Sequence, residues 1–395
     1  MISLRTSLIA LSLLFVTIPP YGLQAAATRF AYLDAFATAR GNAFTATADN
    51  ASAIFYNAAG LIQIEGTEFR ANLLAISATF EYEGDFGASD DIDDAFQPIP
   101  SLYIAHNFED LPIAVGFGAY APFALGTDWG SDASFASGLL GVAVPYEGQL
   151  AYVKYQPTLS WQINNSLSVG IGVSFDDSDV ELLTNALEYE GDDQTFGYTV
   201  SVLWRPSEQH SFGLNYQAKT ELTYEGTAQG LLTMGFPVDA QVDLIFPESI
   251  VAGYAYKPNE KWNFEFNLDW TNWDRVNELT IDGVPAASYQ LNWISAYIWE
   301  FGATRFFENG WHLSAGYTFV ENAIPDDDFL PIVPDEDRHF FSIGVGQDLE
   351  HFFWMLTFQQ AVADPRRVSG NNFPTVNGDY DLDSTAFSLS LGYRF

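Results

Sequence analysis

The sequence predicts an all-β fold: a transmembrane, antiparallel β-barrel of about 14 strands with an N-terminal plug inside its lumen. Three observations support this fold class. Hydrophobic residues make up 48% and aromatic residues 16% of the 395 residues, yet beyond the N-terminus no apolar run reaches the roughly 20 residues of a membrane-spanning helix. Apolar and polar residues alternate with a period of two in one segment after another. The connections between these segments alternate between short and long, as in bacterial outer-membrane barrels.

The first 27 residues resemble a secretory signal peptide. A basic residue, Arg5, precedes an apolar stretch from Leu8 to Ile18, and small residues follow at 25–27. This order is typical of a cleaved signal, so we expect the mature protein to be exported. A membrane anchor is the alternative, but the apolar stretch is short and Pro19 and Pro20 follow it.

Residues 28–66 precede the first strand and are expected to form the plug. A barrel of this size encloses a bore that would leak small solutes unless it were filled. The segment is rich in Ala, Thr and Asn, and it also carries many apolar residues: Phe30, Tyr32, Leu33, Phe36, Phe44, Ile54, Phe55, Tyr56, Leu61 and Ile62. These residues predict packing of the plug against the barrel, an apolar ligand pocket between plug and wall, or both. A disordered periplasmic tail is the alternative.

Residues 67–395 are expected to form the barrel. In the last segment Phe387, Leu389 and Leu391 share one face, while Ser388 and Ser390 share the other, as expected of a strand between lipid and lumen. Six short and seven long connections join the strands, and the long ones include 176–194 and 364–383, where acidic residues gather. Tight turns are periplasmic and long loops extracellular in such barrels, so both mature termini are expected in the periplasm of a Gram-negative bacterium.

Composition excludes several function classes. The net charge of −36 disfavours nucleic acid as a partner, because both would be strongly negative. The absence of cysteine excludes disulfides and thiolate metal sites. Asp379, Asp381 and Asp383 have the spacing that begins an EF-hand, but the required Gly is missing. We therefore interpret the acidic connections as solvated surface, with calcium as a weaker alternative, and expect no metal and no cofactor.

No catalytic motif is found. The sequence contains no G-x-S-x-G, P-loop or H-E-x-x-H pattern. Its five histidines are spread along the chain, at His106, His210, His312, His339 and His351. We expect no enzyme activity and no catalytic residues, which leaves passage or binding of a ligand.

Several stretches resemble the FadL family of outer-membrane transporters, and the likeness covers nearly the whole mature chain. The plug motif Asn57, Ala58, Ala59 and Gly60 is similar to the family's Asn-Pro-Ala-Gly, with Ala58 in place of the proline. That change removes a fixed φ from the turn. The other similar stretches are 39–43 (ARGNA), 116–126 (GFGAYAPFALG), 156–174 (QPTLSWQINNSLSVGIGVS), 269–276 (DWTNWDRV) and 334–340 (PDEDRHF).

The resemblance implies a monomeric barrel for passive uptake of long-chain fatty acids or related hydrophobic compounds. The ligand would be captured at the extracellular loops, bound beside the plug and released sideways into the membrane, without nucleotide. Outer-membrane lipid and lipopolysaccharide would surround the barrel, and the assembly machinery would bind the C-terminal strand ending in Phe395. Candidate ligand-binding residues are Arg40, Phe44, Phe55, Tyr56, Lys154 and Lys219, and both lysines are expected to face the lumen.

The ligand class stays open at this point. A fatty-acid carboxylate should meet Arg or Lys, yet the chain after Phe175 carries Asp176, Asp177, Asp179 and Glu181. The scarcity of cations favours uncharged aliphatic or aromatic hydrocarbons as the alternative cargo. A further alternative is a porin or an adhesin that works through its acidic loops.

Overall fold

The computed structural model describes residues 28–93, 97–108, 110–136, 143–284 and 287–395. The expected signal peptide, residues 1–27, lies outside the described residues. No helix among the described residues is long and apolar enough to span a membrane.

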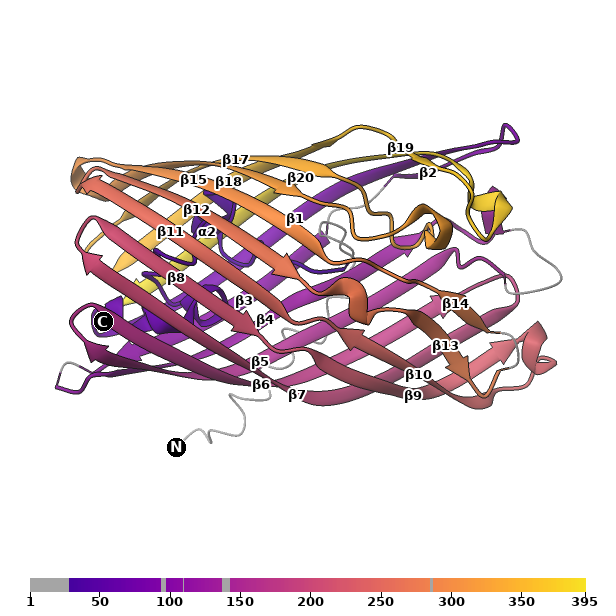
Figure 1. Cartoon of the computed structure of the whole chain (residues 1–395), viewed down its shortest axis with the longest axis horizontal. Coiled ribbons are helices and arrows are strands. Elements are labelled where there is room, and N and C mark those ends of the chain that lie inside the picture. Colours follow the sequence, from indigo (N-terminus) through magenta and orange to yellow (C-terminus); the bar gives the residue numbers. More distant parts are fainter. Residues whose placement is uncertain (1–27, 94–96, 109, 137–142, 285–286) are drawn as a thin grey trace.

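A single antiparallel sheet closes into a barrel of 14 strands, which confirms the predicted fold class (Figure 1). The wall consists of β1 (Thr67–Gly84), β3 (Gln97–Asn107), β4 (Ile113–Asp128), β5 (Glu147–Asn164), β6 (Leu167–Leu183), β7 (Leu187–Ser207), β8 (His210–Gln217) continued by β9 (Thr220–Gly230), β10 (Val238–Phe246) continued by β11 (Ser249–Asn259), β12 (Trp262–Thr271), β15 (Ala296–Phe306), β16 (Trp311–Val320), β17 (Arg338–Asp348), β18 (Phe352–Ala363) and β20 (Gly378–Arg394). Short strands extend it: β2 (Ser89–Asp93), β13 (Glu278–Asp282), β14 (Ser288–Gln290) and β19 (Arg366–Val368).

The first and last strands close the barrel. β1 and β20 pair from Glu68 opposite Arg394 to Gly84 opposite Gly378. The C-terminus lies at the end of the barrel where the hairpins are tight (Figure 1). Phe387, Leu389 and Leu391 are exposed on the outer face of β20, and Ser388 and Ser390 are buried. The alternation predicted from the sequence therefore sorts β20 into a lipid face and a lumen face.

Several strands are longer than expected. The segment 176–194 was predicted to be a long loop, but β6 continues to Leu183 and β7 begins at Leu187. Asp379, Asp381 and Asp383 likewise lie on the outer face of β20, and their EF-hand-like spacing is the period of a strand. The alternation persists because the wall extends beyond the apolar band, where outward side chains meet water and can be acidic.

The plug lies inside the barrel near the end with tight turns (Figure 1). It contains the short helices α2 (Ala35–Ala39) and α3 (Ala53–Tyr56) and the 3₁₀ helix η1 (Ala58–Gln63). Further 3₁₀ turns lie in the connections: η2 (Ser134–Ala136), η3 (Leu231–Thr233), η4 (Trp273–Arg275), η5 (Glu308–Gly310), η6 (Asp326–Asp328) and η7 (Pro374–Val376). Nearly every residue from 28 to 64 is buried, so the plug depends on the barrel wall for its packing.

Candidate ligand pathway inside the barrel

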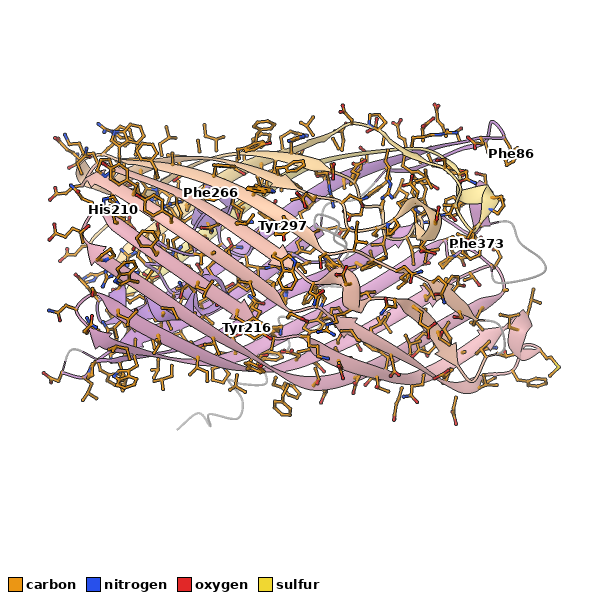
Figure 2. All side chains as sticks on the ribbon, in the orientation of Figure 1. Phe86, His210, Tyr216, Phe266, Tyr297 and Phe373 are labelled. Atoms are coloured by element: carbon orange, nitrogen blue, oxygen red, sulfur yellow. The ribbon has the colours of Figure 1, made fainter. Side chains whose placement is uncertain are left out.

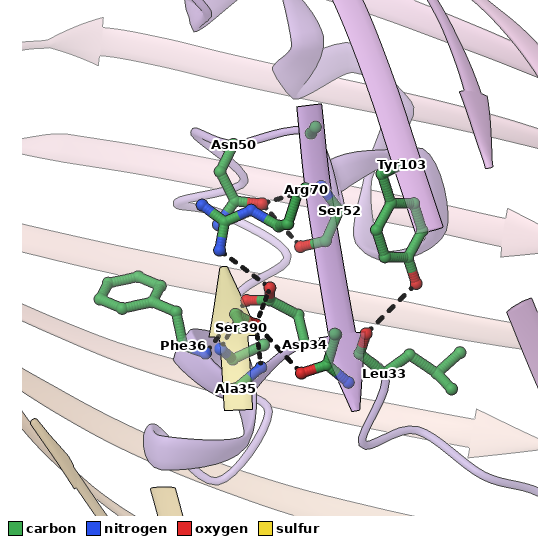
Figure 3. Close-up of polar contacts among 12 residues, drawn as sticks. Leu33, Asp34, Ala35, Phe36, Asn50, Ser52, Arg70, Tyr103 and Ser390 are labelled. Carbon is green, nitrogen blue, oxygen red and sulfur yellow. Dashed lines mark hydrogen bonds and ion pairs between the residues drawn. The ribbon is translucent and has the colours of Figure 1, made fainter. Parts of the chain in front are cut away.

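Asp34 ties the start of helix α2 to the barrel wall (Figure 3). One carboxylate oxygen caps the helix by accepting hydrogen bonds from the amides of Phe36 and Ala37 at 3.1 and 3.2 Å. The other accepts from Arg70 on β1 at 2.9 Å and from Ser390 on β20 at 3.0 Å. Helix termini carry unpaired N–H groups, and the cap satisfies two of them. This network anchors the plug at the seam between the first and last strands.

A second anchor joins the plug to β12. Glu265 accepts hydrogen bonds from the amides of Ala46 and Thr47 at 2.7 and 3.0 Å. It also forms an ion pair with Arg40 at 3.3 Å, and both side chains are fully buried. Arg40, a candidate ligand residue, therefore lies in a buried ion pair between the plug and the wall. A buried charge needs such a partner because burial removes its hydration.

The plug motif forms a turn that is held by the Asn57 side chain. Its Oδ1 accepts from the amide of Ala59 at 3.1 Å, and its Nδ2 donates to the carbonyls of Thr45 and Val202 at 2.7 and 3.0 Å. Gly60 approaches the plug backbone so closely that a Cβ would lie 2.1 Å from the carbonyl oxygen of Ala48. These contacts fix the turn although Ala58 replaces the proline.

Phe44, Phe55 and Tyr56 come together in one aromatic cluster. Tyr56 packs edge to face against Phe44 and Phe55, with ring centroids 5.5 and 4.9 Å apart. Phe55 also contacts Tyr120 of β4 at 5.3 Å. All three plug side chains are buried. The cluster packs the plug against the wall beside β4, and its role in ligand binding stays a prediction.

The two candidate lysines occupy different environments. Lys154 faces the lumen and forms an ion pair with Asp176 at 3.0 Å, and the side chains of both are buried. Lys219 does not face the lumen: 42% of its side chain is exposed, and it pairs with Glu221 on the outer surface. The expectation for Lys219 was wrong because Gln217 and Ala218 are both buried at the junction of β8 and β9, which shifts the alternation by one residue.

An apolar chamber lies in the lumen toward the end with long connections. Most of the side chains that line it are apolar, as is typical of sites for small hydrophobic molecules. Only a few polar residues border it, namely Thr28, Gln149, Glu181 and Tyr189, and among the described residues no Lys, Arg or His does. Its apolar lining includes Leu125, Leu150, Leu182, Val242, Phe246, Trp273, Val276, Trp293, Leu330, Ile332 and Val333.

The connections between strands supply a large part of this chamber, which the sequence reasoning did not anticipate. Trp273 and Trp293 lie between β12 and β15, and Ile332 lies between β16 and β17. Trp273 is 1% exposed. The sequence signal was the presence of apolar residues, such as Ile332, in a connection predicted to lie on the surface, since apolar residues are usually buried.

The barrel wall is interrupted between β3 and β4. Their ladder covers only Leu102 opposite Ala119 through Asn107 opposite Ala114. Beyond it, β4 has a register shift against β5 and residues 118–127 are all buried. Residues of the plug replace the missing partner: the amide of Phe30 donates to the carbonyl of Pro122 at 2.7 Å, and that of Ala124 donates to Thr28 at 3.0 Å. This part of β4 therefore bends away from the lipid face and pairs with the start of the plug.

Proline at two positions of β3 accompanies this interruption. Pro98 and Pro100 pair with β1, and neither can donate a backbone hydrogen bond. Proline is tolerated in a sheet where its missing N–H would point away from a partner. The two prolines therefore suit the edge of β3 that faces the interruption.

Comparisons with known proteins agree with this architecture. The family model described as outer membrane protein transport protein (OMPP1/FadL/TodX) matches residues 21–395. An outer-membrane protein of Neisseria meningitidis serogroup B is 22% identical over 371 residues, 77% of this chain and 78% of that protein. The long-chain fatty acid transport protein of Escherichia coli K12 is 21% identical over 179 residues, 41% of this chain and 40% of that protein.

Two crystal structures show the same fold. A FadL homologue of Pseudomonas aeruginosa superposes with a TM-score of 0.79 at 16% identity, covering 95% of this chain and all of that one. The Pseudomonas putida toluene transporter TodX gives a TM-score of 0.73 at 15% identity, covering 94% and 100%. Together with the family match over nearly the whole chain, the closed barrel, the plug and the chamber identify this protein as a member of the FadL/TodX family of outer-membrane transporters of hydrophobic compounds, and not an enzyme.

Proposed function

We propose that this protein mediates passive uptake of uncharged hydrophobic compounds, aliphatic or aromatic hydrocarbons, across the outer membrane. The observation that carries the proposal is the apolar chamber, which no cationic side chain borders among the described residues. The relatives leave the ligand open, because one is named for long-chain fatty acids and another for toluene.

The buried lysine and arginine side chains among the described residues support a neutral ligand, because each of them has a carboxylate partner. Lys154 pairs with Asp176, and the remaining pairs are Arg29 with Asp269, Arg40 with Glu265, Arg70 with Asp34 and Glu68, and Arg338 with Asp335. A fatty-acid carboxylate in the lumen would have to displace one of these acids or lose its hydration without compensation. A hydrocarbon gains about 0.8 kcal/mol for each buried CH₂ and needs no counter-ion.

The proposed route leads from the chamber, past the start of the plug, to the interruption between β3 and β4. Leu125 of β4 and Thr28 of the plug both border the chamber, and Thr28 also bonds to β4. Release there would pass the ligand sideways into lipid and keep it out of periplasmic water. We place the end with tight turns and the C-terminus in the periplasm, and the long connections outside, as in other bacterial barrels.

Long-chain fatty acids are the second candidate, favoured by the name of the Escherichia coli relative. A polar-solute porin is disfavoured because the buried plug blocks the lumen near the end with tight turns.

Binding measurements on the purified, detergent-solubilised protein test the proposal. Hexylbenzene and oleate are compared on wild type and on Gly148→Phe. A Cβ at Gly148 would lie 3.1 Å from Ile332 and 3.3 Å from Leu125, so the new ring fills the chamber. The matched control is Ala71→Phe, which adds the same ring on the lipid face of β1. We expect hexylbenzene to bind wild type and Ala71→Phe but not Gly148→Phe. Preferential binding of oleate would support the second candidate, and equal hexylbenzene binding by all three proteins would exclude the chamber as the site.

A further inference from the structure

The outer wall carries a groove over β11, β12, β15 and β16. Its floor is made by Ala303 and Ala315, which face each other across the β15–β16 ladder. Aromatic side chains form the rim: Tyr254, Tyr256, Phe264, Phe266, Phe301 and Tyr317. Figure 2 shows Phe266 on the wall between His210, at the end with tight turns, and Tyr297 farther along.

The plug explains the glycines beside this groove but not its alanines. A Cβ on Gly302 would lie 2.5 Å from the carbonyl oxygen of Arg40, and one on Gly316 would lie 2.0 Å from the amide nitrogen of Gly41. Both glycines are therefore required by the plug on the inner side. Ala303 and Ala315 point outward, where larger side chains such as Phe301 and Leu313 are accommodated on the same strands. Their small size leaves a hollow in the lipid-facing surface.

A cation lies at the end of this hollow. Arg305 follows Ala303 by two residues on the same face of β15, which corresponds to about 7 Å along a strand. Its guanidinium lies over the ring of Trp262 at 4.9 Å and that of Phe307 at 5.7 Å. Lys261 is exposed in the adjoining turn, and its carbonyl accepts from the amide of Phe306 at 2.9 Å. Within the described residues neither Arg305 nor Lys261 forms an ion pair.

Two neighbouring cations without an acidic partner are unusual in a protein with a net charge of −36. Most other basic side chains of the described part are paired with acids, including the exposed Lys219 and Arg367. Glu260 and Glu308 lie in the same two turns but form no ion pair with Arg305 or Lys261. The guanidinium therefore has hydrogen-bond donors available to an anion in the membrane.

The depth of the site in the membrane identifies the anion. Aromatic residues such as Trp262, Phe307 and Trp311 gather where a barrel meets the lipid headgroups. Arg305 lies at that level, and the alanine hollow lies deeper, at the level of the acyl chains. We propose that this surface binds one phospholipid of the periplasmic leaflet, with its phosphate diester on Arg305 and Lys261 and one acyl chain along Ala303 and Ala315. The assignment to the periplasmic leaflet rests on the orientation proposed above, whereas the binding site itself does not depend on it.

Native mass spectrometry of the full chain in detergent tests this site with dioleoylphosphatidylglycerol. We expect wild type to bind one molecule and Arg305→Gln to bind it about ten- to a hundredfold more weakly, because the phosphate loses a hydrogen bond to a charged group. Ala303→Leu should weaken binding with the charge intact. The controls are Ala71→Leu, a lipid-facing alanine on β1 outside the groove, and Lys219→Gln, a cation outside it; both should bind like wild type.

The comparison lipids separate the possible occupants. Dioleoylglycerol, which lacks the phosphate, should bind weakly to every variant. Equal affinity of wild type, Arg305→Gln and Ala303→Leu would overturn the proposal, as would a dimer whose interface covers the groove. Stronger binding of lipid A than of phosphatidylglycerol would overturn the assignment to the periplasmic leaflet. None of these results depends on hexylbenzene or oleate, so the transport proposal stands or falls separately.

Discussion

Replacing Asp176 with Asn should destabilise the barrel and at the same time create a carboxylate site in its lumen. Asp176 is fully buried and accepts from the Lys154 ammonium at 3.0 Å and from the Tyr152 hydroxyl at 2.7 Å. The variant keeps the size of the side chain but leaves the ammonium without its counter-charge. Removing one partner of a buried ion pair costs about 3–5 kcal/mol, because the remaining charge stays buried and uncompensated.

The same uncompensated charge should attract an anionic ligand. A charge-assisted hydrogen bond of about 1.5–3 kcal/mol corresponds to an affinity gain for oleate of about ten- to a hundredfold. Hexylbenzene has no charge, so its affinity should change little. The assays are the thermal unfolding midpoint, followed by tryptophan fluorescence in detergent, and equilibrium binding of both ligands.

Two further variants make this prediction specific. Lys154→Met combined with Asp176→Leu replaces the pair by apolar side chains and should restore stability to near that of wild type or above. Glu221→Gln removes the partner of the exposed Lys219, a change of about 1 kcal/mol or less, and should leave oleate binding unchanged. An Asp176→Asn protein that unfolds at the wild-type temperature and binds oleate no better would refute the reasoning that paired cations exclude carboxylates.

Three other predictions address the loops, the orientation and the plug. Burial raises the pKa of Glu336, in the connection before β17, from 4.5 to about 8. Between pH 4.5 and 8 the Glu336 carboxyl is therefore ionised in the unfolded chain and protonated in the folded one, so the thermal unfolding midpoint should fall as the pH rises through this range. Glu336→Gln should flatten this pH dependence. The chain has no cysteine, so a single introduced cysteine can be labelled specifically. Met234 is 85% exposed, and Met234→Cys should react with a membrane-impermeant maleimide on intact cells, whereas Glu260→Cys should react only after lysis. The reverse pattern would show that the proposed orientation is inverted. Asn57→Ala removes a buried side chain that makes three hydrogen bonds within the plug and to the wall. This change should lower the free energy of unfolding by about 1–3 kcal/mol. An unchanged unfolding midpoint would show that other contacts hold the turn.

The sequence by itself determined the kind of wall and the presence of the plug. A period of two depends only on the geometry of an extended chain, so the faces of β20 could be assigned residue by residue. The family resemblance located the plug motif, and Asn57 occupies the turn expected of it.

Only the tertiary structure decided which charges meet and where the ligand space lies. Arg40 and Glu265 are 225 residues apart, and their pairing depends on how the closed barrel places β12 against the plug. The chamber is assembled from connections whose apolar residues, such as Trp273 and Ile332, follow no strand period. One register shift between β8 and β9 was enough to turn Lys219 from the lumen to the outer surface. These features depend on contacts between distant segments, and local alternation carries no information about which distant segments meet.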